Sequence, residues 1–139
     1  MYKKILVAAD GSDHSKRAVQ EAVKMAKANP GANVTLLYVI DYEKARNEIL
    51  QSQGPDGLHL ERRKHLQPLE EICRSAGVHF ETKILHGAPG PTIVKHANET
   101  GYDAVFIGSR GLNALQEMVL GSVSHKVAKR VQAPVIIVK

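Results

Sequence analysis

The stretch DAVFIGSRGLNALQEMVLGSVS, residues 103–124, places an apolar strand-like run, a glycine-rich loop and the start of a helical pattern directly after one another. Three of the chain's 11 glycines, Gly108, Gly111 and Gly121, lie in this stretch. Glycine loses more backbone entropy on folding than any other residue, so three of them at the end of a strand require an explanation. A tight turn and a cradle for an anionic ligand both fit this loop.

Outward from this stretch, strand-like and helix-like patterns alternate along the whole chain. Apolar runs predict strands at 3–9, 33–40, 78–85, 103–108 and 133–139. Helical patterns lie between them: after Ser12 or Asp13 as N-cap, over residues 58–76, after the prolines of HGAPGP, and from about Gly121. With short links and right-handed crossovers, this order predicts an α/β fold, an open parallel sheet of five strands with helices on both faces.

Two segments depart from the regular alternation. Residues 41–57 are polar and contain the turn cluster GPDG, which predicts a mobile loop or a loose helix. Pro68 lies inside the third helical region and removes one ladder hydrogen bond, so we expect a kink or a helix that begins near it. The apolar face of the last helix is expected to consist of Val123, Val127, Ala128 and Val131.

Length and composition bound the class of protein. A chain of 139 residues with 43% hydrophobic and 24% charged residues fits one globular domain, residues 1–139. No apolar run approaches the ~20 residues needed to span a bilayer, and the opening MYKKILVAADGS does not resemble a signal peptide, so we expect no membrane partner. The single cysteine, Cys73, excludes an internal disulfide and suits a cytoplasmic location.

The net charge of +5 and the pI of 9.4 admit either nucleic acid or a small phosphate-bearing ligand as a partner. The basic residues are scattered through the clusters YKK, SKR, ERRKH and HKVAKR, and aromatic residues make up only 4% of the chain. A nucleic-acid surface needs a dense basic patch with stacking aromatics, so this distribution argues against one.

In an open α/β sheet, ligands bind beyond the carboxyl ends of the strands, at the switch point between neighbouring connections. Three loops are expected to meet there: residues 8–12, residues 39–41 and the glycine segment. The last helix is expected to begin with four residues whose amides and hydroxyls can point at phosphate oxygens, Gly121, Ser122, Val123 and Ser124. The Walker A pattern and G-x-G-x-x-G are both absent, which excludes the two commoner phosphate loops.

The spacing of the glycines is similar to a known motif. Gly108, Gly111, Gly121 and Ser122 fill every defined position of G-x2-G-x9-G-[ST], the nucleotide motif of ATP-binding universal stress proteins. The opening ILVAADGSDHSKRAV, the segments TLLYVID and HGAP, and the closing APVIIVK resemble this family as well. The resemblance covers nearly the whole chain apart from about residues 41–60, and it favours the phosphate cradle over the plain turn.

The resemblance implies the strand order 3-2-1-4-5, a homodimer that pairs through the last strand (Val135 to Val138), and ATP as the ligand. Ala9 and Val39 would contact the adenine, and Asp10 would bind ribose hydroxyls or a phosphate-bound Mg or Mn ion. The ribose and the α-phosphate would be lined by Ile107, Gly108, Arg110 and Gly111. The four residues from Gly121 to Ser124 would hold the β- and γ-phosphates.

The predicted role is a nucleotide-dependent regulatory or stress-response module that acts on an unidentified protein partner. Phosphoryl transfer needs a positioned nucleophile, charge clamps on the γ-phosphate and usually a metal. The sequence offers a cradle and the carboxylate of Asp10, so we expect no catalytic residue and slow or no hydrolysis. The alternative is a stress scaffold of the same family that binds no nucleotide, and the intact glycine motif argues against it.

Overall fold

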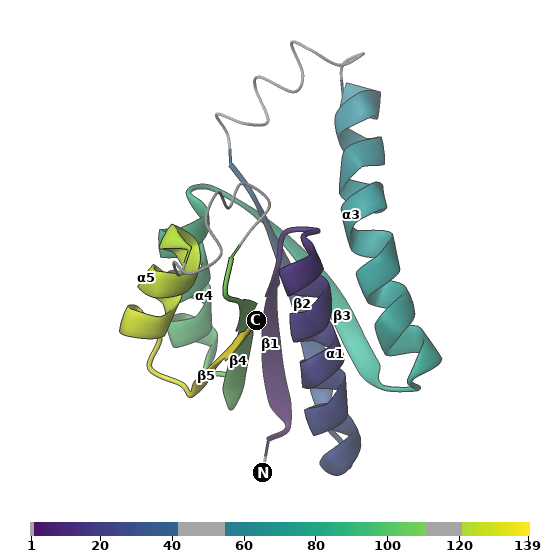
Figure 1. The fold of residues 1–139 in the computed structure, drawn as a ribbon, viewed down its shortest axis with the longest axis vertical. Helices are drawn as coiled ribbons and strands as arrows, with labels where there is room; N and C mark the ends of the chain where they lie inside the picture. Colours follow the sequence, from purple (N-terminus) through teal and green to yellow (C-terminus); the bar gives the residue numbers. More distant parts are fainter. Residues whose placement is uncertain (1, 42–54, 111–120) are drawn as a thin grey trace.

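Residues 2–41, 55–110 and 121–139 are described in a computed structural model of the chain. Five parallel strands form one sheet in the order β3-β2-β1-β4-β5, which confirms the expected fold class and strand order (Figure 1). The strands are β1 (Lys4–Ala9), β2 (Asn33–Ile40), β3 (His79–His86), β4 (Ala104–Gly108) and β5 (Val135–Val138). Each lies where an apolar run predicts it, with its ends shifted by two residues at most.

The helices of the described residues are α1 (Asp13–Ala28), α3 (Pro55–Ser75), α4 (Pro89–Thr100) and α5 (Ser122–Arg130). α1 and α3 cover one face of the sheet, and α4 and α5 cover the other (Figure 1). The strand order therefore reverses between β1 and β4, because the connection after β1 crosses one face and the connection after β4 crosses the other. This switch point is where open α/β sheets bind ligands.

The sheet divides the interior into two hydrophobic cores. Ile5 and Val7 of β1 pack on the side of α1 and α3, whereas Leu6 and Ala8 pack on the side of α4 and α5. Ile5, Leu6 and Val7 are fully buried, and burial of each such side chain contributes about 1.5–3 kcal/mol. Because β1 is buried on both faces, a register shift would be costly, and the end of β1 is a firm base for a site.

The first helix is capped by Ser12 rather than by Asp13. The Ser12 hydroxyl oxygen accepts a hydrogen bond from the backbone N–H of Ser15 at 3.1 Å. Asp13 is the first helical residue, where its negative charge is favoured by the helix dipole. β1 ends at Ala9 and α1 begins at Asp13, so a loop of only three residues connects them.

The expected start of the helix near Pro68 is wrong, because α3 begins at Pro55 and runs through Pro68. A proline inside a helix costs about 3 kcal/mol, since it removes a hydrogen bond and its ring crowds the preceding turn. Pro68 and Lys64, whose carbonyl loses its helical partner, are both exposed residues, while Leu66 and Leu69 are buried. Of the segment 41–57, residues 42–54 lie outside the described part of the chain.

Two smaller expectations also need correction. α4 begins at Pro89 itself rather than after its prolines, because the fixed φ of proline suits the first helical position. Ala128 of α5 is exposed, and Ser124 takes part in the buried face instead, whereas Val127 and the C-cap Val131 are buried and Val123 packs against them, as predicted.

β3 and β5 are the two edges of the sheet, and each exposes one large apolar side chain. Ile84 of β3 is 40% exposed and Ile137 of β5 is 38% exposed. The homodimer through β5 stays a prediction. Among the described residues, no helix combines the length and apolar character that crossing a membrane requires.

Candidate functional site

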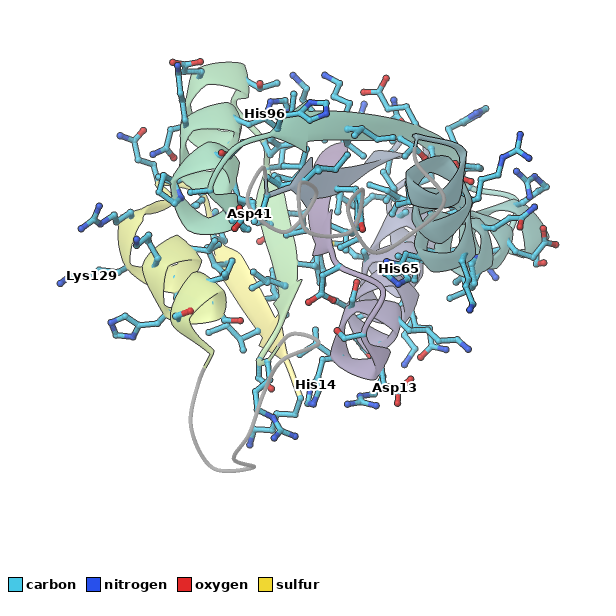
Figure 2. All side chains as sticks on the ribbon, turned by 90° about the horizontal axis from the view of Figure 1, so that it is seen from above. Asp13, His14, Asp41, His65, His96 and Lys129 are labelled. Atoms are coloured by element: carbon cyan, nitrogen blue, oxygen red, sulfur yellow. The ribbon has the colours of Figure 1, made fainter. Side chains whose placement is uncertain are left out.

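The candidate site lies at the switch point, where the carboxyl ends of β1 and β4 stand side by side. Ala8 of β1 is in register with Ile107 of β4, so the loops that follow these two strands leave the sheet next to each other. Figure 2 views the molecule from above, on the side of these carboxyl ends, with His14 at the start of α1 and His65 on α3. Three elements, α1, α3 and α5, therefore contribute residues around this end of the sheet.

The loop after β1 is held in a tight turn. The Asp10 carboxylate accepts a hydrogen bond from the backbone N–H of Ser12 at 2.9 Å, and the Asp10 N–H donates to the Ser15 hydroxyl at 3.2 Å. Gly11 has a φ of +84°, a conformation that favours glycine. A side chain at Gly11 would also place its Cβ 2.7 Å from Cγ of His65. The turn is thus fixed from both sides, by α1 and by α3.

Gly108 ends β4 and is explained by packing alone. A Cβ atom at this position would lie 2.6 Å from Cβ and 2.9 Å from the carbonyl carbon of His14. Cβ atoms in real proteins essentially never approach other heavy atoms this closely, and the carbonyl carbon belongs to the rigid first turn of α1. Gly108 therefore lets α1 approach the end of β4, with or without a ligand.

Gly121 has no such explanation in the described residues. Its φ is −60°, which any residue adopts, and a Cβ would meet Cα of Arg110 at 3.4 Å, the Ser109 carbonyl oxygen at 3.5 Å and Oγ of Ser124 at 3.7 Å, which are ordinary contacts. The position is the N-cap of α5, where Ser, Thr, Asp and Asn are preferred because their side chains accept a backbone N–H. Neither the backbone conformation nor a contact with the described residues therefore requires a glycine at this position.

The first turn of α5, which follows Gly121, carries free backbone donors. The first N–H groups of a helix have no intrahelical acceptor and carry a partial positive charge. The Gly121 carbonyl already accepts the first helical bond, from His125 N–H at 2.8 Å. The Ser124 hydroxyl is buried and donates to the Gly108 carbonyl at 2.5 Å, so it ties α5 to β4 rather than facing outward. The backbone N–H groups are therefore the main donors that this turn offers to an anion.

Ser109 joins the elements that surround the site. Its N–H donates to the Val138 carbonyl of β5 at 2.7 Å, and its carbonyl accepts from the Gly121 N–H at 2.8 Å. Its hydroxyl lies 3.2 Å from Nδ1 of His14. A residue that the glycine motif leaves undefined thus connects β4, β5, α1 and α5.

Arg110 adds a positive charge to the candidate site, and its guanidinium contacts the ring of His14. Its Nη2 atom lies 3.1 Å from Nε2 of His14. The sequence pattern contained no indication of this, because His14 stands among seven dispersed histidines without metal-ligand spacing. Its position in the first turn of α1, four residues after Asp10, is the one signal that could have suggested a site residue.

His65 is a second residue that the sequence did not point to. Its Nδ1 atom lies 3.2 Å from the hydroxyl of Tyr38, and the two rings meet edge to face with centroids 6.1 Å apart. Tyr38 precedes Val39 on β2, so this pair covers the loop of Asp10 and Gly11 on the α3 side. His65 lies within the helical region predicted over residues 58–76, but no local pattern marks it as a site residue.

The remaining predicted site residues lie at the same end of the sheet with different exposure. Ala9 and Ile107 are buried in opposite cores, so their side chains contact protein and only their backbone could meet a ligand. Val39 and Asp10 are partly exposed. Gly111 lies outside the described residues. In the part of the chain that is described, no three His, Cys, Asp or Glu residues are grouped so that they could hold a metal ion.

Comparison with known proteins identifies the family to which the whole chain is similar. Residues 1–139 match the profile described as Universal stress protein family. Universal stress protein YxiE of Bacillus subtilis is 38% identical over 154 residues, with 100% of both chains covered. The solved structure of hypothetical protein MJ0577 superposes with a TM-score of 0.86 at 32% identity, covering 100% of this chain and 96% of that one.

A third relative was solved with a bound nucleotide. The universal stress protein from Archaeoglobus fulgidus in complex with dAMP has a TM-score of 0.74 and 26% identity, and the match covers 99% of this chain and 98% of that one. Adenine nucleotide binding therefore occurs in a protein of the same fold and similar sequence.

Proposed function

The chain belongs to the universal stress protein family, and from this membership we propose that it binds ATP at the switch point as a nucleotide-dependent regulatory module of the stress response. The dAMP complex of the Archaeoglobus fulgidus relative supports an adenine nucleotide as the ligand class. Hydrolysis is proposed to be slow or absent, so the bound nucleotide acts as a signal rather than as a substrate.

The observation that carries the proposal is that nothing among the described residues requires a glycine at position 121. Packing explains Gly108 and a positive φ explains Gly11, whereas neither explains Gly121. A phosphate group close to the first turn of α5 would explain it, because a side chain at this position would occupy the place of the phosphate oxygens. The amides of this turn and the guanidinium of Arg110 supply donors and positive charge to the same place.

The proposed contacts follow the three loops. The backbone of Ser122, Val123 and Ser124 holds the β- and γ-phosphates, with Gly121 leaving room for them. Gly108, Ile107 and Arg110 line the ribose and the α-phosphate, together with Gly111 outside the described residues. Ala9 and Val39 contact the adenine. Asp10 binds ribose hydroxyls or a Mg or Mn ion carried by the phosphates, and its turn with Ser12 already fixes the direction of its carboxylate.

The experiment is isothermal titration of the purified protein with ATP, comparing the wild type with Gly121→Val and Ala128→Val. Gly121→Val is expected to weaken ATP binding by about 100-fold or more, because it displaces several charge-assisted hydrogen bonds of about 1.5–3 kcal/mol each. Ala128→Val adds a similar branched side chain at an exposed position of the same helix and should bind like the wild type.

Gly121→Val should still fold, with a thermal unfolding midpoint lowered by about a few degrees, because a Cβ there meets only ordinary contacts and the poorer N-cap costs about 1 kcal/mol. Absence of heat with wild-type ATP titrations would favour a stress scaffold without nucleotide. Turnover of ATP at ordinary enzyme rates that is lost in Asp10→Ala would instead contradict the proposed absence of catalysis.

A further inference from the structure

Both ring nitrogens of His14 are engaged, and their partners define which nitrogen carries the proton. Nε2 lies 3.1 Å from Nη2 of Arg110, and Nδ1 lies 3.2 Å from the Ser109 hydroxyl. A guanidinium has only N–H donors, so Nε2 must be the acceptor and cannot carry a proton. Nδ1 then carries the proton and donates to the Ser109 oxygen. The observed arrangement requires a neutral imidazole.

Protonation of His14 and its contact with Arg110 therefore exclude each other. A doubly protonated ring would place an N–H group and a positive charge against the guanidinium, which has no lone pair to accept with. The charged residues nearest to His14 in sequence are Asp10 of the loop after β1 and, on α1, Asp13, Lys16 and Arg17. Arg17 is itself occupied, since its Nε donates to the Lys139 carbonyl at 2.6 Å.

We propose that His14 is a positioning residue that holds Arg110 in the ligand-free site and takes up a proton when a nucleotide phosphate draws Arg110 away. This inference rests on the proposed binding of ATP. An arginine–phosphate contact is charge-assisted and stronger than a contact with a neutral imidazole, so the phosphate competes successfully for Arg110. The vacated Nε2 atom then lies close to negative charge, which favours the protonated ring.

The atoms balance in a simple exchange. Nε2 gains one proton from solvent, Nδ1 keeps its proton on the Ser109 hydroxyl, and Arg110 stays protonated throughout. Because the Ser109 backbone is bonded to both Val138 and Gly121, retention of the Nδ1 contact keeps the main chain beneath the phosphates in place. His14 would thus make ATP binding dependent on pH without touching the nucleotide itself.

The test is titration calorimetry with ATP at about pH 7 in two buffers of different ionisation enthalpy, PIPES and imidazole, for wild type, His14→Gln and His79→Gln. Glutamine can accept from Arg110 and donate to Ser109 but does not titrate, so it matches the neutral ring. His79 is exposed at the other end of the sheet, at the start of β3, and controls for the loss of a histidine.

The wild type and His79→Gln are expected to take up more protons per ATP than His14→Gln, by a difference of at most one proton. The titration of ATP itself is common to all three proteins and cancels in this comparison. If one full proton is taken up, the ATP affinity of the wild type should rise about tenfold for each unit by which the pH is lowered. The ATP affinity of His14→Gln should lack this additional dependence on pH. Such a result supports the proposal.

Equal proton uptake in wild type and His14→Gln would overturn the proposal while leaving ATP binding intact. Absence of ATP binding in the folded wild type would instead overturn the proposed function. If His14→Gln fails to fold or to bind, nitrogen NMR of the imidazole in the wild type decides. A His14 ring that stays neutral in the ATP complex contradicts proton uptake, and a doubly protonated ring supports it.

Discussion

Gly108 and Gly121 belong to one sequence motif, but different contacts surround them. Gly108 is pressed against the backbone of His14, so its lack of a side chain serves the packing of α1 on β4. Gly121 has ordinary distances to its neighbours and ordinary φ. One glycine of the motif is therefore required by the fold, whereas no contact among the described residues requires the other.

This difference predicts that alanine destabilises the protein more at position 108 than at position 121. Gly108→Ala should lower the free energy of unfolding by about 1–3 kcal/mol, the usual cost of overpacking, because the first turn of α1 must shift. Gly121→Ala should cost about 1 kcal/mol or less, the penalty of a poorer N-cap. Urea denaturation of the two variants measures both values. Equal destabilisation would show that Gly121 is also a packing glycine.

Cys73 is a second residue whose behaviour follows from its surroundings. It is fully buried between α3 and the sheet, and burial, with a smaller contribution from Glu70, raises the pKa of its thiol to about 11. Because the thiolate is the reactive form, only about one thousandth of this thiol would be ionised at pH 8.

We therefore expect Cys73 to react with a thiol reagent such as DTNB only after denaturation. The matched control is the double variant Cys73→Ala and Ser75→Cys, which moves the thiol two residues along α3 to an exposed position. This control should react within minutes in the native state. Fast modification of native wild-type Cys73 would show that α3 opens readily from the sheet.

At the scale of elements, sequence patterns predicted all five strands and the order of helices between them. Strands buried on both faces, such as β1 and β4, are continuous apolar runs, and the edge strand β3 alternates between apolar and polar residues. The helical pattern over residues 58–76 predicted α3 to within three residues, but it could not decide how Pro68 is accommodated, since the local penalty of Pro68 is outweighed by burial of Leu66 and Leu69 against residues distant in sequence. The glycine motif predicts the phosphate side of the candidate site, and this stays a prediction. The contacts of His14 and His65 arise only from the packing of α1 and α3, so no local pattern contains them.

α4 carries a titratable contact of its own, at the opposite end of the sheet from the candidate site. Nε2 of His96 lies 2.7 Å from the hydroxyl of the buried Tyr102, and Thr100 lies 3.4 Å from Nδ1. Burial lowers the pKa of His96, and the nearby charges of Lys83 and Lys4 lower it further. The folded protein thus favours the neutral ring relative to the unfolded chain.

Stability from this contact is complete above the ordinary imidazole pKa of about 6.5 and is lost as the pH falls through the lower folded-state value. His96→Gln should therefore flatten the decline in unfolding free energy between pH 7 and pH 5, measured by urea denaturation. His79→Gln should keep the wild-type slope, since His79 is exposed. The lowered pKa of Asp103, which accepts from the N–H groups of Lys4 and Lys3, acts only below pH 4 and does not interfere. An unchanged slope in His96→Gln would contradict this assignment.

At the scale of the whole molecule, the two edges of the sheet present the same problem. An exposed edge strand offers unpaired backbone groups to another chain and is usually protected by charge, proline or a partner. β3 bears charges at Glu81 and Lys83 beside its exposed Ile84. β5 is the short run VIIV, with no charged side chain between its ends and with Ile137 exposed.

This asymmetry supports β5 as the edge that pairs in a homodimer. Ile137→Lys should convert the dimer to a monomer at micromolar concentration in analytical ultracentrifugation, because two-fold symmetry places the unfavourable charge in the interface twice. Ile84→Lys is the matched control: it makes the same change on a side chain of similar exposure at the opposite edge, and it should sediment as the wild-type dimer. A wild type that sediments as a monomer would contradict the dimer altogether. Dissociation by Ile84→Lys but not by Ile137→Lys would move the interface to β3. This strand is the sheet edge opposite β5, whose Val138 carbonyl accepts the hydrogen bond from Ser109, so pairing of subunits would then occur far from the loop of the candidate site.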